Sequence, residues 1–215
     1  VGTMSSGQGH ETSFPQLLCE WLQIPFEKVR YITNDTDRVS VGGGSHSGRS
    51  MRLVSIALGE AVAELLAKGK AIAAHILQAA EDDITFQDGA FAATGGGSMD
   101  LWEVARAAGG LESAGDITNR AGGYPYGAHV CEVEVDPDTG QVTIAAWTGV
   151  DDVGLAVNPL ILHGQAHGAV MQGLGQALLE EIHYDPDSAQ LLSGSFQDYA
   201  MPRADTMPMI KTVIM

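Results

Sequence analysis

The sequence contains little of what several classes of protein require. Lys and Arg number only 11 against 27 Asp and Glu, which gives a formal net charge of −16. A chain this acidic repels nucleic-acid phosphates and anionic lipids. We therefore expect neither nucleic acid nor a membrane as a partner. The sequence also has no secretory signal and no stretch of about 18 apolar residues that could cross a bilayer.

Cysteine is equally scarce. Cys19 and Cys131 are the only two, and they do not form a Cys-x-x-Cys pair, which argues against a disulfide framework or a protein-held iron–sulfur cluster. We therefore expect a reducing, cytoplasmic setting. The composition, with 45% hydrophobic and 18% charged residues, is that of a globular chain. Because the sequence starts at Val1 and stops in an apolar run at 208–215, we expect it to be a piece of a longer protein.

Hydrophobic spacing predicts a mixture of helices and antiparallel hairpins. Helices are expected over residues 10–24, 51–80, 98–108 and 159–181, with a short helical piece at 196–201. Alternation predicts strands at 28–35 and 208–215, and turn residues predict hairpins centred on 88–89, 136–140 and 185–187. This order predicts an α+β fold of two α/β lobes with antiparallel hairpins and long helices. The glycine-rich stretch 109–123 is the best linker candidate, and we divide the chain into lobes 1–118 and 119–215.

Residues 7–12 read Gly-Gln-Gly-His-Glu-Thr directly before a predicted helix. Free N–H groups at a helix N-terminus favour a negative or strongly accepting ligand. Glycine lets such a ligand approach the main chain, and Gln8 offers both a donor and an acceptor. The alternative is an ordinary glycine turn with a helix cap.

Residues 42–50 read Gly-Gly-Gly-Ser-His-Ser-Gly-Arg-Ser, again before a helix. Glycines, hydroxyls and Arg49 at a helix N-terminus are typical of a phosphate-binding loop, and Arg49 could make a bidentate contact. The spacing is not that of a Walker loop. The alternative is a flexible loop with a solvated arginine.

A third group lies on the helix predicted from residue 159. At about 100° per residue, Gln165, Gln172 and Gln176 fall within a narrow arc beside a stripe formed by Gly164, Gly168 and Gly175. This arrangement invites close approach by a polar, planar partner, although Gly-x-x-x-Gly spacing also serves helix–helix packing. Together the three groups predict a cradle for a large, polar, phosphorylated cofactor.

Histidines offer a competing interpretation. His163 and His167 are one helical turn apart, and His10 and His46 lie in glycine loops, so a zinc hydrolase could be built from them. No His-Glu-x-x-His motif is present, and helical histidine pairs without a third ligand usually belong to polar networks. We assign no protein-held metal site.

Five stretches carry a resemblance to a known family: GQGHET, NDTDRVSVGGGSHSGRS, YPYGAHVCEVEVDPDTGQV, VDDVGLAVNPLILHGQAHGAVMQGLGQALLEE and DYAMPRADTMP. In this order, over nearly the whole chain, they resemble the molybdenum-binding subunit of the xanthine dehydrogenase, aldehyde oxidoreductase and carbon monoxide dehydrogenase family. The resemblance implies a molybdopterin-binding domain, with molybdenum–molybdopterin as cofactor in the cytosine dinucleotide form of bacterial members. It implies that the metal is held by the dithiolene sulfurs of the pterin. The cofactor-binding residues carried over are Gln8, Gly9, His10, Glu11, Thr12, Gly44, Ser45, Ser47, Arg49, Ser50, Gln165 and Gln172.

The resemblance also implies a chemistry, hydroxylation of an aldehyde or N-heterocycle or oxidation of carbon monoxide. Electrons would leave through iron–sulfur clusters and FAD on partner domains or subunits, in an oligomer that includes the remainder of the molybdenum subunit. The catalytic glutamate of the family lies in a Gly-x-Gly-Glu motif, which this sequence does not contain. We therefore assign no catalytic residue and expect the chain alone to be inactive. A non-catalytic binding or assembly module of the same fold, without cofactor, is the alternative.

Overall fold

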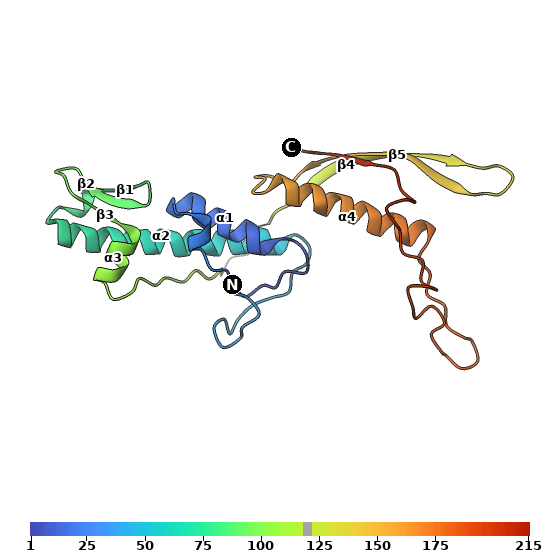
Figure 1. Ribbon diagram of the computed structural model, residues 1–215, viewed down its shortest axis with the longest axis horizontal. Coiled ribbons are helices and arrows are strands. Elements are labelled where there is room, and N and C mark those ends of the chain that lie inside the picture. Colours follow the sequence, from blue (N-terminus) through green and yellow to red (C-terminus); the bar gives the residue numbers. More distant parts are fainter. Residues whose placement is uncertain (118–121) are drawn as a thin grey trace. The chain divides into compact units, whose positions relative to one another are not determined.

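The computed structural model describes residues 1–117 and 122–215, which form two compact units, Val1–Gly123 and Tyr124–Met215 (Figure 1). The described part of the predicted linker that follows Gly110 contains neither helix nor strand. The predicted boundary after residue 118 falls on residues outside the described part of the chain. The division into lobes 1–118 and 119–215 therefore stays a prediction, and the two units are considered separately below.

The first unit combines three helices with a small antiparallel sheet. The helices are α1 (His10–Leu22), α2 (Arg49–Leu77) and α3 (Leu101–Ala107), with short 3₁₀ turns at Phe26–Lys28 and Glu81–Asp83. The sheet has the order β1-β2-β3, formed by β1 (Ile84–Gln87), β2 (Ala90–Ala93) and β3 (Ser98–Asp100).

The core of this unit forms where α2 meets α1, α3 and the β1–β2 hairpin (Figure 1). Phe91 is 1% exposed and Val104 is fully buried. Complete burial of one such side chain stabilises the fold by about 1.5–3 kcal/mol. Gly69 of α2 lies directly under the Phe91 ring. The hairpin can pack this closely against α2 because the helix has no side chain at this position.

Local chemistry explains where these elements begin and end. Asp88 and Gly89 both have positive φ, at 52° and 74°, as a tight hairpin turn requires. Asp100 accepts from the Glu103 N–H at 2.6 Å while the Glu103 carboxylate accepts from the Asp100 N–H at 2.8 Å. This capping box starts α3 at Leu101. The helix expected over 98–108 is therefore shorter than predicted, because its first residues pair as β3.

The second unit is a three-stranded sheet with one helix. It contains β4 (Tyr126–Val135), β5 (Val142–Asp152), α4 (Pro159–Leu178) and β6 (Ile210–Ile214). The order is β4-β5-β6, with β4 antiparallel and β6 parallel to β5. Its small core is formed by Ile144, Val170, Leu174 and Ile210. The hairpin predicted around 136–140 and the predicted last strand are confirmed.

Two sequence predictions are wrong. Residues 29–33 are not assigned to a strand, because they have no ladder partner among the residues that the structure describes, and a strand exists only as part of a ladder. Residues 196–201 form turns rather than a helix, as expected of so short a segment without extensive packing. The predicted hairpin at 185–187 is reduced to a single antiparallel bridge between Tyr184 and Leu191.

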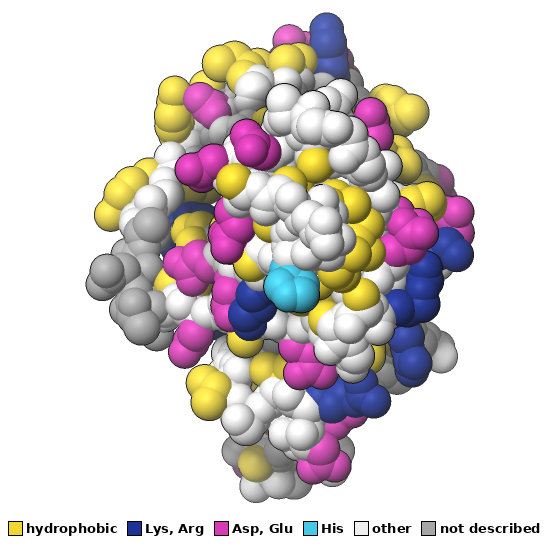
Figure 2. All heavy atoms as spheres, turned by 90° about the vertical axis from the view of Figure 1, so that its left-hand side faces the viewer, with side chains coloured by type: hydrophobic (Ala, Val, Ile, Leu, Met, Phe, Trp, Pro, Cys, Tyr) yellow, Lys and Arg dark blue, Asp and Glu magenta, His cyan; other side chains and the backbone are white. Residues whose placement is uncertain are grey.

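Acidic side chains do not gather into one patch on the face drawn in Figure 2. On the face drawn in Figure 2, acidic side chains recur between apolar and basic ones. No helix in the described part of the chain has the length and apolar character needed to cross a membrane.

Candidate functional site

The first glycine loop leads directly into α1. Gly7 and Gly9 have φ values of 101° and 70°, a region that glycine enters freely. The Gly9 carbonyl accepts from the N–H groups of Thr12 and Ser13, both at 3.0 Å. The Gln8 side chain folds back and accepts a hydrogen bond from the Ser6 N–H through Oε1. Gly7 is exposed, and Gln8 and Gly9 are partly buried, and the binding role of this turn stays a prediction.

The second glycine loop leads into α2 in the same way. Ser47 and Gly48 both have positive φ, at 52° and 65°, so the chain reverses sharply just before Arg49. Arg49 donates from Nη1 to the Gly44 carbonyl at 2.8 Å. A Cβ atom at Gly43 would collide with this guanidinium. The Arg49 guanidinium thus packs directly over Gly43, and a side chain at position 43 would displace it.

A cluster of hydroxyl groups joins the second loop to the segment that precedes the first. Thr3 Oγ1 lies 2.9 Å from Ser45 Oγ and 2.8 Å from Ser50 Oγ, and Ser50 Oγ donates to Ser45 Oγ at 3.0 Å. The Gly43 N–H donates to the Gly2 carbonyl at 3.0 Å. The structure thus brings the second loop alongside residues 2–4, only a few residues before the Gln8 turn.

Sequence reasoning missed Thr3, which is 5% exposed and anchors this junction. Thr33 donates to the Thr3 carbonyl at 2.7 Å and holds it from another side. A single threonine outside any glycine motif carries no sequence pattern that could have indicated this role.

The N-termini of α1 and α2 differ from those of α3 and α4 in how they are capped. Gly9 and Gly48, which precede α1 and α2, provide no side-chain cap. In contrast, Asp100 caps α3 and Asn158 caps α4 through its side chain. A helix N-terminus without a side-chain cap keeps N–H groups available for an anionic ligand. The two uncapped helices are those that follow the predicted loops.

Two buried polar atoms near the first loop have no hydrogen-bond partner. Among the described residues, the buried side-chain atoms without a partner are Ser5 Oγ, His10 Nδ1 and Arg52 Nε. Ser5 and His10 flank the Gln8 turn. His10 is 4% exposed, and its burial lowers the pKa of the imidazole, opposed by the nearby Glu11 carboxylate. Such unpaired atoms are costly unless a further group satisfies them.

The predicted glutamines belong to the second unit. Gln165, Gln172 and Gln176 are all exposed on α4, on the side away from the buried residues Val170 and Leu174. At Gly164 and Gly168 an added Cβ would meet nothing within 4 Å. Gln165 and Gln172 are therefore accessible to a ligand. Their convergence with the loops of the first unit stays a prediction.

The histidine pair on α4 belongs to a polar network. His163 Nδ1 lies 2.7 Å and His167 Nε2 lies 3.2 Å from the Thr212 hydroxyl of β6. The pair thus fastens the helix to the sheet, as proposed for such pairs. Within the described residues, no group of three or more His, Cys, Asp or Glu side chains could hold a metal ion.

Glycine loops that lead into helix N-termini are an arrangement that can bind anionic groups through main-chain amides. Residues 1–208 match the family described as the molybdopterin cofactor-binding domain, and the chain belongs to this family.

The relatives include chains of two dehydrogenases. The chain is 36% identical over 220 residues to the 6-hydroxypseudooxynicotine dehydrogenase complex subunit gamma of Paenarthrobacter nicotinovorans, covering 97% of this chain and 28% of the relative. It is 31% identical to the carbon monoxide dehydrogenase large chain of Afipia carboxidovorans, covering 99% of this chain and 27% of that one.

The fold agrees with solved structures of related enzymes. A crystal structure of the Cu,Mo carbon monoxide dehydrogenase matches with a TM-score of 0.89 and 31% identity, over 100% of this chain and 28% of the other. Quinoline 2-oxidoreductase from Pseudomonas putida 86 matches with a TM-score of 0.82 and 30% identity, over 99% and 29%. The predicted α+β fold and the family resemblance are confirmed. The chain spans less than a third of the length of these relatives.

Proposed function

We propose that residues 7–12 and 44–50 hold the phosphate-bearing part of a molybdopterin dinucleotide and that Gln165 and Gln172 contact its pterin. The observation that carries this proposal is the pair of helix N-termini without a side-chain cap in the first unit. The hydroxyl contacts of Thr3 with Ser45 and Ser50 also join the second loop to the segment that precedes the first. Both ends offer main-chain donors where negative charge is stabilised by the helix dipole.

The residues present fit such a cofactor. The positive side chain near the second loop is Arg49, which is held in place by the Gly44 carbonyl and keeps further donors available. The buried His10 Nδ1 provides one more polar group that still needs a partner. When bound, the cofactor supplies the redox-active molybdenum, whereas the residues of this chain bind it, orient it and exclude water from its phosphates.

We further propose that the chain acts as one portion of a molybdenum hydroxylase that oxidises an aldehyde, an N-heterocycle or carbon monoxide. Its relatives include a dehydrogenase complex subunit and a carbon monoxide dehydrogenase chain, which supports this class. On this proposal the cytosine dinucleotide is the cofactor form, iron–sulfur and FAD subunits accept the electrons, and the complex is cytoplasmic. The catalytic base belongs to the remainder of the subunit, so the chain alone is inactive.

The test uses the full-length subunit in its complex. Arg49→Ala and Gln165→Ala are compared with matched controls, Arg38→Ala and Gln176→Ala, which remove the same side chains outside the assigned set. Loss of a charge-assisted hydrogen bond costs about 1.5–3 kcal/mol, so Arg49→Ala should release the cofactor at least ~10-fold faster, and Gln165→Ala somewhat less so. Bound molybdenum, phosphate and cytidine nucleotide are measured over time after dilution.

Equal retention in all four variants would contradict the assigned residues. A folded, assembled complex that contains no molybdenum, phosphate or cytidine nucleotide would instead support the alternative of a cofactor-free assembly module. The control variants separate these outcomes from a general loss of stability.

A further inference from the structure

Residues 29–33 have the composition of a β-strand, but within the described residues they pair with no other strand. Val29 is extended, with φ −97° and ψ 122°, and its N–H donates to the Phe26 carbonyl at 3.0 Å. The Ile32 carbonyl accepts from the Val1 nitrogen at 2.9 Å. Within the described residues, the N–H groups of residues 30–33 donate to no backbone carbonyl. The N–H groups of this segment are thus available to hydrogen-bond with a further strand.

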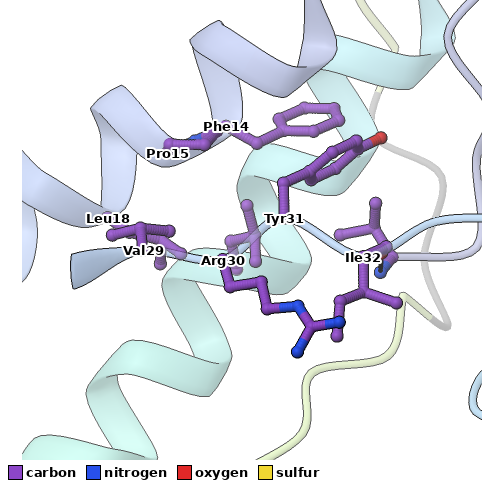
Figure 3. A pocket seen from close by; sticks show the side chains of 9 residues that line it. Phe14, Pro15, Leu18, Val29, Arg30, Tyr31 and Ile32 are labelled. Atoms are coloured by element: carbon purple, nitrogen blue, oxygen red, sulfur yellow. Dashed lines mark hydrogen bonds between the residues drawn. The ribbon is translucent and has the colours of Figure 1, made fainter. Parts of the chain in front are cut away.

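The composition of this segment also favours a strand. Val29, Tyr31, Ile32 and Thr33 are β-branched or aromatic residues, the types enriched in sheets. Tyr31 lies against α1, with its ring centroid 6.1 Å from that of Phe14. Figure 3 shows the Arg30 side chain directed away from Phe14. The neighbouring side chains of Arg30 and Tyr31 thus point in different directions, as neighbours along a strand do.

An open apolar pocket lies beside the segment. It measures about 170 Å³ and is lined by Phe14, Pro15 and Leu18 of α1, Leu58 of α2 and the extended residues themselves (Figure 3). An apolar hollow next to unpaired backbone groups is the combination that an added strand satisfies, because its amides complete the ladder while its side chains fill the hollow.

We propose that a β-strand from the remainder of the molybdenum subunit pairs with residues 29–33 and covers this pocket. The chain spans 28% of its relative from Paenarthrobacter nicotinovorans and 28% of the matched carbon monoxide dehydrogenase chain, so most of the subunit is available to supply the strand. The inference rests on the proposed function only in placing the chain within such a subunit. It does not require the cofactor.

Hydrogen exchange of the full-length molybdenum subunit, followed by mass spectrometry, tests this proposal. If the strand is present, the alternate amides of residues 30–33 that face it exchange at least ~100-fold more slowly than in a free peptide, as hydrogen-bonded strands do. The β1–β2 hairpin serves as the protected reference. Exchange at free-peptide rates in residues 30–33 would overturn the proposal.

Comparing the large subunit alone with the assembled complex identifies the source of the strand. Protection that persists when the large subunit is produced without its partner subunits supports a strand from the same polypeptide. Protection only in the assembled complex would mean that a partner subunit supplies it, which overturns the proposal. Protein made without molybdopterin should show the same protection, so failure of cofactor binding is distinguishable from failure of this inference.

A proline variant gives an independent check. Arg30→Pro removes one N–H that has no backbone acceptor within the described chain, so it is harmless unless an outside strand uses the ladder. We expect it to reduce the protection of residues 29–33 at least ~10-fold. The control is Ala80→Pro, at an exposed position whose φ of −71° suits proline. Equal protection of residues 29–33 in both variants would count against the added strand. If Arg30→Pro does not fold, the exchange of the unaltered subunit is the test of the proposal.

Discussion

His10 combines burial, ring stacking and an unpaired nitrogen at the entrance to α1. It is 4% exposed, and its ring centroid lies 4.9 Å from that of Phe14, one helical turn further along. Burial penalises the charged imidazolium and so lowers the pKa of His10. A neutral imidazole keeps one nitrogen free to accept a hydrogen bond, which suits a position facing a ligand donor or an ordered water.

This pKa predicts a specific pH dependence of stability. The unfolded chain takes up a proton near pH 6.5, whereas the folded chain does so only at lower pH. The contribution of His10 is therefore fully present above pH ~6.5 and is lost as the pH falls through the window between the two pKa values. In the cofactor-free full-length subunit, the melting temperature should fall less between pH 7.5 and 5 in His10→Phe than in the unaltered protein.

The matched control is His75→Phe, which replaces an exposed histidine on α2. It controls for the loss of an imidazole ring as such. Parallel profiles for His10→Phe and the unaltered protein would show that His10 is protonated as readily in the folded as in the unfolded chain.

Helix α2 organises the first unit, and its glycines differ in purpose. A Cβ atom on Gly69 would collide with the buried Phe91 ring, whereas a Cβ atom on Gly59 would meet only Trp21 Cη2 at 3.9 Å, an ordinary contact. Both positions lie in the interior of the helix, where alanine is intrinsically preferred by about 1 kcal/mol. The same substitution should therefore have opposite effects at the two positions.

We expect Gly59→Ala to stabilise the full-length subunit by up to about 1 kcal/mol. Gly69→Ala should destabilise it, because overpacking a core costs about 1–3 kcal/mol and exceeds the gain in helix propensity. Chemical denaturation of the cofactor-free protein measures both. A stabilising Gly69→Ala would mean that the hairpin shifts freely away from α2.

Elements specified by nearby residues were predictable from sequence. The hairpin at Asp88-Gly89 and the start of α4 at Pro159 follow from turn and cap chemistry within a few residues. The glycine loops of the candidate site belong to this group, because glycine clusters before helices are local signals. The strand expected over 28–35 failed for the opposite reason, since a strand depends on a partner that can lie anywhere in the chain. Thr3 was missed likewise, because its contacts with Ser45 and Ser50 cross more than forty residues.

At the scale of the whole molecule, the residues proposed to bind the cofactor come from both units. The loops at 7–12 and 44–50 belong to Val1–Gly123, whereas Gln165 and Gln172 belong to Tyr124–Met215. A ligand that contacts both units binds only when both are folded. Its binding therefore stabilises the two units together. This coupling distinguishes one shared cofactor site from two separate ligand sites.

Cofactor-loaded and cofactor-free forms of the full-length subunit should therefore differ at three places simultaneously. We expect hydrogen exchange in residues 7–12, 44–50 and 164–173 to slow more in the loaded form than exchange in the β1–β2 hairpin, which reports only the overall gain in stability. At ligand concentrations about 1,000 times the dissociation constant, the gain in stability is about 4 kcal/mol, which is enough to slow exchange strongly in both units. Protection confined to the first unit would mean that the glutamines of α4 face something other than the cofactor. Gln165→Ala would then leave cofactor release unchanged while Arg49→Ala still accelerates it.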